Sequence, residues 1–571
     1  MRGAALAATV VLTFSAGAPA AFSAEINSGG KGGQGSHQGP GKNHGKPGAG
    51  HGKPGAGHGK PGKPGPGKPG HGPGKPGHPG HPGKPGKSDS EKLRDKVTLN
   101  GVYSHLQGLQ NAANYNGGNR AAGTPGYEAG AQYVERQLRK AGYQPFRQPF
   151  TYEQFLLNGE LLEQVSPDAA EYAAGTDFTT MSYSGAGDVT AEVTAVDINL
   201  TGERANTSGC EPEDFADFTA GNIALMQRGT CAFSIKVANA AAAGASAAIV
   251  FNQGVIPTED RTGLLNGTVE TLSAIPAVGT TYALGESLAG TEGATVRVVV
   301  DSVIQETETF NVIADTPKGD PTRQIVVGAH LDSVDEGPGI NDNGSGTAAV
   351  LETAIQLGKT GKFKLENQIR FAFWGAEEDG LVGSQYYVDQ LDETGAANTL
   401  LNLNFDMLGS TNFVRFVYDG DASTFPAPIG PPVGSDVIEG VFEDYFASQN
   451  LPTAPTAFDG RSDYYAFIAR DIPAGGLFTG AEGIKTEEEA ALFGGTAGEP
   501  YDPCYHQECD DLGNISKQAL AEQSDAVAHT TLTFAQSDAD IRGGDGVSSA
   551  RALPSDPATQ GPQYRGHEAL R

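Results

Sequence analysis

The stretch VVGAHLDSVDEGPGINDNGSG, residues 326–346, decides the fold class, because it begins as a buried strand and turns polar where the strand ends. The predicted strand covers residues 323–330 and closes on His330, and a glycine-rich, charged loop with Asp332 and Asp342 follows. A nearly continuous apolar strand is typical of a parallel sheet that is covered on both faces. The polar residues after it are therefore candidates for a binding site at the sheet edge, not for the core.

The same alternation continues downstream of this stretch. Residues 346–360 and 384–393 have the spacing of helices, and residues 367–375 and 399–406 read as buried strands. Upstream, residues 126–140 carry apolar side chains at helical spacing. The pattern predicts an α/β fold, in which a mostly parallel central sheet is flanked by helices.

Composition divides the chain into segments. An apolar run after Arg2, followed by small residues, is typical of a secretory signal, which predicts a secreted, extracellular protein without a membrane span. The Gly/Pro/Lys/His-rich segment that follows cannot bury enough apolar surface to fold. The predicted layout is a signal peptide (1–24), a disordered arm (25–90), an α/β domain in two parts (91–155 and 300–535), a β-rich insert (156–299) and a disordered tail (536–571).

Charge separates the arm from the rest of the chain. Residues 31–87 hold ten lysines and no acidic residue, whereas the whole chain carries a formal charge of −29. The acidic body argues against nucleic acid as a partner, because nucleic-acid binding needs a basic surface. A flexible spacer is the simpler interpretation of the arm, and contact with an anionic cell wall is the functional one. We expect the chain to act as a monomer.

Four cysteines, an even number, suit an exported protein with disulfides. Pairing within each predicted domain favours Cys210 with Cys231 and Cys504 with Cys509. The other two pairings stay open at the level of sequence.

Polar side chains follow several of the predicted strands. Binding sites of open α/β sheets lie outside the carboxyl ends of the strands, so these side chains are expected to meet at one edge. Imidazole and carboxylate groups are ligands of zinc, and a pair of metal ions needs at least one bridging ligand. The sequence therefore predicts a two-metal site. Its candidate residues are His330, Asp342, Glu377, Glu378, Asp406 and His506.

Three of the carboxylates near the predicted site suggest distinct roles. Asp332 lies two residues after His330, on the same side of an extended chain, and is expected to accept the other ring N–H of that histidine. Of the adjacent Glu377 and Glu378, one is expected to be a ligand and the other a proton acceptor. Each residue alone is more often structural, but their joint occurrence at successive strand ends favours the metal site.

Several motifs together resemble those of a known family. The stretches are GAHLDS, GINDNGSG, FWGAEEDGLVGS, NFDMLGS, FDGRSDYYAFI and YDPCYHQECDDL. They resemble the secreted dizinc aminopeptidases of the bacterial leucyl type, over roughly residues 95–155 and 305–535. Residues 156–300, with the mark QRGTCAF, are similar to a protease-associated domain inserted in the peptidase. The resemblance implies the zinc exopeptidase fold.

The resemblance also implies which residues hold the metals. One zinc ion would be bound by His330 and Asp406, and the second by Glu378 and His506. Asp342 would bridge the two ions. Members of the family can also hold a calcium ion, for which no ligands are matched here.

Three further roles follow from the same motifs. Glu377 would be the general base, Tyr505 would polarise the scissile carbonyl, and Arg461 would contact the substrate. The bulky stretch DYYAFI after Arg461 departs from the pattern and would reshape the specificity pocket.

The sequence thus predicts a secreted aminopeptidase that releases N-terminal residues, hydrophobic and leucine-type by the resemblance, from peptide substrates by metal-activated water. A carboxypeptidase on the same fold is one alternative, and it would need Arg461 as the partner of the substrate carboxylate. A glutaminyl cyclase would typically use one zinc ion only. A non-catalytic surface-binding protein would have lost ligands that this chain retains.

Overall fold

A computed structural model describes residues 87–201, 207–254, 259–425, 430–543, 564–565 and 567–570. The expected signal peptide and nearly all of the expected arm lie outside these residues. Within the described part of the chain, no helix is long and apolar enough to cross a membrane.

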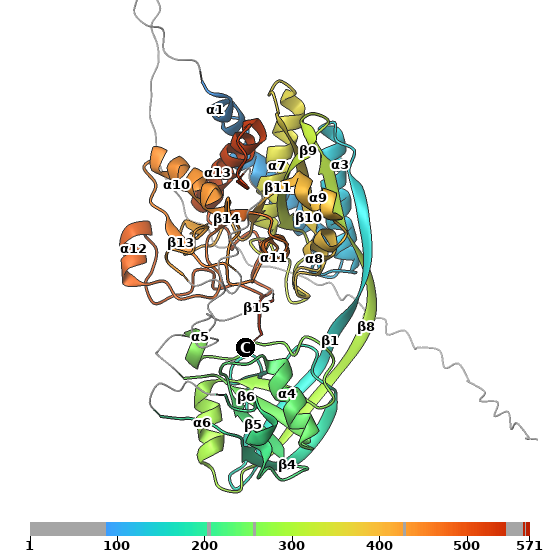
Figure 1. The fold of residues 1–571 in the computed structure, drawn as a ribbon, viewed down its shortest axis with the longest axis vertical. Helices are drawn as coiled ribbons and strands as arrows, with labels where there is room; N and C mark the ends of the chain where they lie inside the picture. Colours follow the sequence, from blue (N-terminus) through green and yellow to red (C-terminus); the bar gives the residue numbers. More distant parts are fainter. Residues whose placement is uncertain are drawn as a thin grey trace, which may run out of the picture. The chain divides into compact units, whose positions relative to one another are not determined.

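Most strands belong to one mixed sheet of 14 strands (Figure 1). At its centre, β10, β9, β11 and β14 are neighbours and run parallel, so their carboxyl ends lie at one edge. The expected parallel core is therefore confirmed. Its strands and their neighbours are β9 (Asp320–His330), β10 (Asn367–Trp374), β11 (Thr399–Phe405), β12 (Phe416–Tyr418), β13 (Ala454–Thr456) and β14 (Ala474–Phe478).

Both faces of this parallel part are buried. In β9, Ile325 and Val327 pack into one apolar cluster, and Val326 between them packs into another on the opposite face. Alternate residues of a strand point to opposite faces, so an unbroken apolar run is what two covered faces require. The helices of this domain are α1 (Asp89–Arg94), α2 (Leu99–Asn114), α3 (Pro125–Lys140), α7 (Gly344–Thr360), α8 (Val382–Asp389), α9 (Glu393–Asn398), α10 (Ser435–Ser448), α11 (Tyr464–Ala469), α12 (Glu487–Phe493) and α13 (Lys517–Gln536).

Two long antiparallel strands connect this main domain to the inserted one (Figure 1). They are β1 (Phe146–Ser166) and β8 (Thr295–Asp315), and they pair from Phe146 with Ile313 to Ser166 with Thr295. The expected boundaries at 155/156 and 299/300 thus fall inside β1 and β8. The chain enters the inserted domain along this strand pair, whose register shifts twice, between Leu157 and Gly159 and between Gln164 and Ser166.

The inserted domain combines short strands with helices. Its strands β5, β6 and β7 are parallel neighbours, and the Cys210–Cys231 disulfide, the pairing that the sequence favoured, lies in it. The elements of this domain are β2 (Ala170–Glu171), β3 (Phe178–Thr180), β4 (Gly187–Ala195), the 3-10 helix η1 (Pro212–Phe215), β5 (Ile223–Gln227), α4 (Phe233–Ala242), β6 (Ala247–Phe251), α5 (Glu259–Thr262), β7 (Ala277–Thr280) and α6 (Tyr282–Gly290).

The end of the chain differs from the disordered tail that composition predicted. Strands β15 (Tyr564–Arg565) and β16 (Glu568–Ala569) form a hairpin, and Ala569 is buried. The amide of Thr268 donates to the carbonyl of Ala569, and the amide of Ala569 donates to the carbonyl of Asn266. A short segment needs no core of its own when another domain supplies hydrogen-bond partners for its backbone and an apolar contact. The composition of the segment gives no information about such a surface on another domain.

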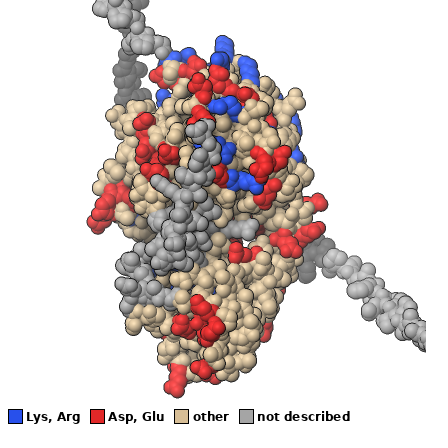
Figure 2. All heavy atoms as spheres, viewed as in Figure 1, with Lys and Arg blue, Asp and Glu red and all other residues tan. Residues whose placement is uncertain are grey.

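Charge on the described surface agrees with an acidic body. Figure 2 shows clusters of Asp and Glu over the face in view, while Lys and Arg gather mainly over the main domain. Within the residues from 87 onward, acidic side chains outnumber basic ones, as the sequence requires.

Candidate active site

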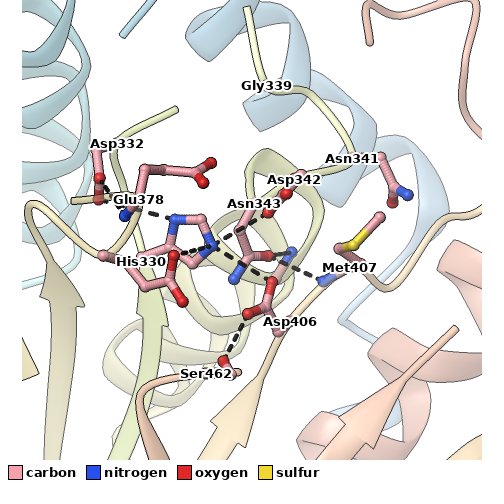
Figure 3. Close-up of polar contacts among 12 residues, drawn as sticks. His330, Asp332, Gly339, Asn341, Asp342, Asn343, Glu378, Asp406, Met407 and Ser462 are labelled. Carbon is pink, nitrogen blue, oxygen red and sulfur yellow. Dashed lines mark hydrogen bonds and ion pairs between the residues drawn. The ribbon is translucent and has the colours of Figure 1, made fainter. Parts of the chain in front are cut away.

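The ends of three parallel strands and the loop after β9 bring His330, Asp342, Glu378 and Asp406 together (Figure 3). His506 reaches them from the loop between Cys504 and Cys509. His330 is the last residue of β9 and pairs in register with Trp374, the last residue of β10. Asp406 follows the last residue of β11, whose Asn404 pairs with Gly328 of β9. Because the strands are parallel and in register, side chains just beyond their ends converge.

Left-handed backbone turns aim the side chains that follow these strands. Ala376 has φ of 57° directly before Glu377, and Met407 has φ of 49° directly after Asp406. His506 itself has φ of 56°. Non-glycine residues rarely adopt such angles, and where they do the surrounding structure holds them. At His506, the Cys504–Cys509 disulfide, the second favoured pairing, closes the loop around it.

Asp342 lies between the two histidines. Its Oδ1 is 3.2 Å from Nε2 of His330, and its Oδ2 is 3.2 Å from Nε2 of His506. Asp406 Oδ1 lies 3.4 Å from the same nitrogen of His330, and Glu378 Oε2 lies 3.1 Å from that of His506. The side chains therefore form two groups that share Asp342.

The donor set fits divalent cations. Carboxylates outnumber imidazoles in one small cavity: the carboxylates are those of Asp342, Glu377, Glu378, Asp406 and Asp459, and the imidazoles beside them are those of His330, His506 and His567. Burying like charges together is costly unless positive charge compensates them. In addition, Oε1 of Glu378 and Oδ1 of Asp406 are buried without a hydrogen-bond partner. Buried acceptors without donors are unusual, and a bound cation is an ordinary explanation.

The pKa values of these side chains also reflect the crowding of buried negative charge. Burial raises the pKa of Glu378 to about 7, and the nearby Asp342 adds to this. Burial alone would lower the pKa of His506, but Glu378 and Asp342 outweigh it and raise that pKa to about 10. Burial also raises the pKa of Glu377 well above its ordinary value, with a contribution from Glu378. Without cations, protons would have to neutralise this cluster.

Asp332 lies beside the ring of His330, on the side away from Asp342 and Asp406 (Figure 3). Its Oδ1 is 3.7 Å from Nδ1 of His330, which is longer than a hydrogen bond. Its Oδ2 accepts a hydrogen bond from the backbone amide of Glu378, at 3.2 Å. Asp332 thus lies beside His330, but the hydrogen bond that the sequence predicted between them is not formed at this distance. Asp332 instead holds the turn that presents Glu378.

Tyr505 and Arg461 lie at the other side of the cavity. The ring of Tyr505 stacks on His506 with centroids 3.9 Å apart, and its hydroxyl accepts a hydrogen bond from Arg461 at 3.2 Å. The guanidinium of Arg461 also donates to both carboxylate oxygens of Glu482, at 2.7 and 3.1 Å. Arg461 is therefore held in a bidentate ion pair beside the cavity.

Sequence reasoning missed several residues that hold this site. Ser462 donates to Oδ2 of Asp406 at 2.5 Å and accepts from the side-chain Nδ2 of Asn404 at 2.8 Å. Asp510 accepts hydrogen bonds from the backbone amides of Asn341 and Asp342. Ser462 lies within the stretch FDGRSDYYAFI and Asp510 within YDPCYHQECDDL, so these motifs could have indicated both residues. His567, whose Nδ1 lies 3.9 Å from Oε2 of Glu378, had no such signal in the glycine- and serine-rich tail.

Comparison with known proteins agrees with this geometry. Residues 311–531 match Peptidase family M28, and residues 189–288 match the PA domain. An aminopeptidase of Pseudomonas aeruginosa is 50% identical over 433 residues, which cover 75% of this chain and 80% of that protein. A probable leucine aminopeptidase 2 of Aspergillus fumigatus is 41% identical over 447 residues, covering 76% of this chain and 84% of its own.

Solved structures give the same picture. An aminopeptidase from Aneurinibacillus sp. strain AM-1 has a TM-score of 0.62 at 27% identity, over 80% of this chain and 98% of its own. A zinc aminopeptidase from Bacillus subtilis has a TM-score of 0.55 at 25% identity, over 78% of this chain and 98% of its own. The chain therefore belongs to peptidase family M28, as an aminopeptidase with an inserted PA domain.

Proposed function

We propose that this zinc-dependent aminopeptidase uses two zinc ions to release hydrophobic N-terminal residues, leucine above all, from peptides. His330 and Asp406 would hold one ion, Glu378 and His506 the other, and Asp342 would bridge them. The observation that carries this proposal is the position of Asp342, whose two oxygens each lie 3.2 Å from a different histidine. A carboxylate that bound a single ion would need to lie close to only one of the two histidines.

The residues of the site divide the chemistry among them. When bound, zinc supplies Lewis acidity, which lowers the pKa of water and polarises a carbonyl. Glu377, buried beside the ligands, is placed to accept the proton of the attacking water and to pass it to the leaving amine. Tyr505 lines the same cavity, and its hydroxyl would donate a hydrogen bond to the carbonyl oxygen.

The walls of the cavity support an exopeptidase with an apolar preference. Met407, Phe478 and Ala481 line it beside the carboxylates. An apolar wall favours an apolar side chain, and the carboxylates of Glu377 and Asp406 favour the positive α-amino group of a free N-terminus. Carboxypeptidase action is disfavoured, because Arg461, the cation it would need, is already paired with Glu482.

Export and the role of the arm belong to the same proposal. Two disulfides among the described residues suit an extracellular enzyme. The ten lysines of residues 31–87 would give salt-sensitive adhesion to an anionic cell wall. Equal retention on wall polymer of a protein without these residues would contradict the adhesion.

One experiment tests class and mechanism together. We expect metal analysis of the purified protein to give two zinc ions per chain. We expect hydrolysis of leucyl p-nitroanilide and no hydrolysis of its N-acetylated form, with activity lost to a zinc chelator and restored by zinc. Equal cleavage of the blocked substrate would contradict an aminopeptidase, and one zinc per active chain would contradict the two-metal site.

A further inference from the structure

The hairpin at the end of the chain is anchored in the inserted domain. Its β16 exchanges backbone hydrogen bonds with Asn266 and Thr268, and the amide of Phe233 donates to the carbonyl of Leu570 at 2.8 Å. Ala569 is 1% exposed and packs in an apolar cluster of that domain. The hydroxyl of Ser182 also donates to the carboxylate of Glu568. These contacts fix the three residues that directly follow His567.

The anchored hairpin places His567 at the candidate metal centre. Its ring lies edge-on to His506, with centroids 4.6 Å apart, and its Nδ1 lies 3.9 Å from Oε2 of Glu378. One ligand atom from each of these three residues lies within 4.8 Å of the other two. Nδ1 of His567 is buried and makes no hydrogen bond. A buried imidazole nitrogen without a partner, aimed at a glutamate and a histidine, is the arrangement that a metal ligand requires.

The hairpin also takes the space that a substrate needs. The cavity over the carboxylates measures about 50 Å³ and has His567 as one wall. Sites for small-molecule ligands usually measure about 300–1,000 Å³. Two further cavities, of about 360 and 340 Å³, also have His567 as a wall. The imidazole therefore lines three cavities at once, one of which contains the candidate ligands.

We propose that His567 is an internal ligand of the metal centre, on the side of Glu378 and His506, and that the hairpin thereby competes with the substrate's N-terminal residue. The inference rests on the proposed function, because it assigns a regulator to that site. Its consequence is an intact chain that inhibits itself and becomes active when the hairpin undocks or is removed. A hairpin docked in roughly 90% of molecules lowers apparent substrate affinity about tenfold, and closer docking lowers it further.

Two variants separate the imidazole from its anchor. His567→Ala removes the nitrogen and leaves the anchor, whereas Ala569→Arg places a charged side chain in the apolar cluster and undocks the hairpin without touching a candidate ligand. Tyr115→Arg adds the same charge at a position that is 84% exposed and serves as the matched control. Each full-length protein is loaded with cobalt(II) in place of zinc, and its visible absorption is recorded. Binding of leucine, the expected product, is measured by calorimetry, and hydrolysis of leucyl p-nitroanilide by absorbance.

We expect both hairpin variants to change the cobalt absorption, because an imidazole nitrogen leaves the metal, and the control to leave it unchanged. The Kd for leucine should fall, and kcat/KM should rise, about tenfold or more. Unchanged cobalt absorption and leucine affinity in both variants would overturn the inference. If Ala569→Arg does not fold, His567→Ala decides by the same measurements. If every protein binds cobalt and none cleaves the substrate, the proposed function fails, while the absorption still decides whether His567 is a ligand.

Discussion

At the scale of single residues, the site depends on adjacent glutamates that face the same cavity with different duties. Glu377 and Glu378 both lie past the end of β10, after the left-handed turn at Ala376. Glu378 contacts His506 at 3.1 Å, whereas Glu377 lies 3.9 Å from His330 and is buried. A ligand and a proton acceptor are thereby held one residue apart.

Glu377→Ala should therefore separate metal binding from turnover. We expect the variant to keep both zinc ions and to lose activity by ~10²–10⁴-fold, the usual cost of removing a general base. Glu378→Ala is the matched comparison, and it should lose zinc as well as activity. Metal analysis beside steady-state kinetics tests both, and near-normal kcat in Glu377→Ala would remove that residue from the role.

A second residue-scale prediction concerns Ser462, which donates to Asp406 at 2.5 Å. Ser462→Ala should weaken zinc binding by ~10–100-fold, because a ligand carboxylate loses the hydrogen bond that orients it. Competition with a chromogenic chelator measures this. An unchanged zinc Kd would show that the end of β11 orients Asp406 sufficiently without the hydroxyl.

At the scale of elements, the short disulfide loop that carries Tyr505 and His506 lies outside the helices and strands of the main domain. Cysteines five residues apart close it, and the strand ends that hold the other ligands have no counterpart there. Cys504→Ser with Cys509→Ser should cost only about 2 kcal/mol of stability, since so small a loop has little entropy to lose. The larger effect should be weaker zinc binding at the His506 side.

The other disulfide is a control for this prediction. Cys210 and Cys231 are 21 residues apart in the inserted domain, which contributes no candidate ligand among its described residues. Replacing both with serine should cost about 3 kcal/mol of stability and leave zinc content unchanged. Equal loss of zinc in both double variants would contradict a local role for the short disulfide. Thermal unfolding and metal analysis give the two readouts.

At the scale of the whole molecule, two domains and the end of the chain meet around a strongly acidic cluster. Zinc binding must displace protons from it, because the pKa of His506 is about 10 and that of Glu378 is about 7 in the absence of metal. A group that must lose its proton before binding makes metal affinity rise with pH. We therefore expect zinc affinity to fall about tenfold for each pH unit from 10 down to 7, where one proton is displaced, and by up to about a hundredfold for each unit below 7, where two are displaced.

Chelator competition at pH 6, 7 and 8 checks this dependence. Below the pKa of Glu378, both Glu378 and His506 are protonated, so the slope should be steeper between pH 6 and 7 than between pH 7 and 8. A pH-independent affinity would mean that the ligands are already deprotonated in the metal-free protein.

The sequence by itself determined the parallel core and the ligand types. An apolar run such as residues 325–329 is buried in almost any fold that contains it, and a strand end is a local feature, so His330 and Asp406 could be located without coordinates. The cysteine pairing was likewise accessible, because each pair lies close in sequence. Periodicity and spacing act over short distances, and these features depend on nothing further.

Only the tertiary structure decided which side chains meet across long separations in the chain. Asp342 faces both His330 and His506. Arg461 forms an ion pair with Glu482. The paired strands β1 and β8 extend from the main domain into the inserted one. The end of the chain is the clearest case. Composition predicted disorder for this segment. His567 nevertheless lies near the ligands, because Ala569, two residues later, packs in an apolar cluster of the inserted domain. Such contacts depend on the shape of a remote surface, which no local pattern records.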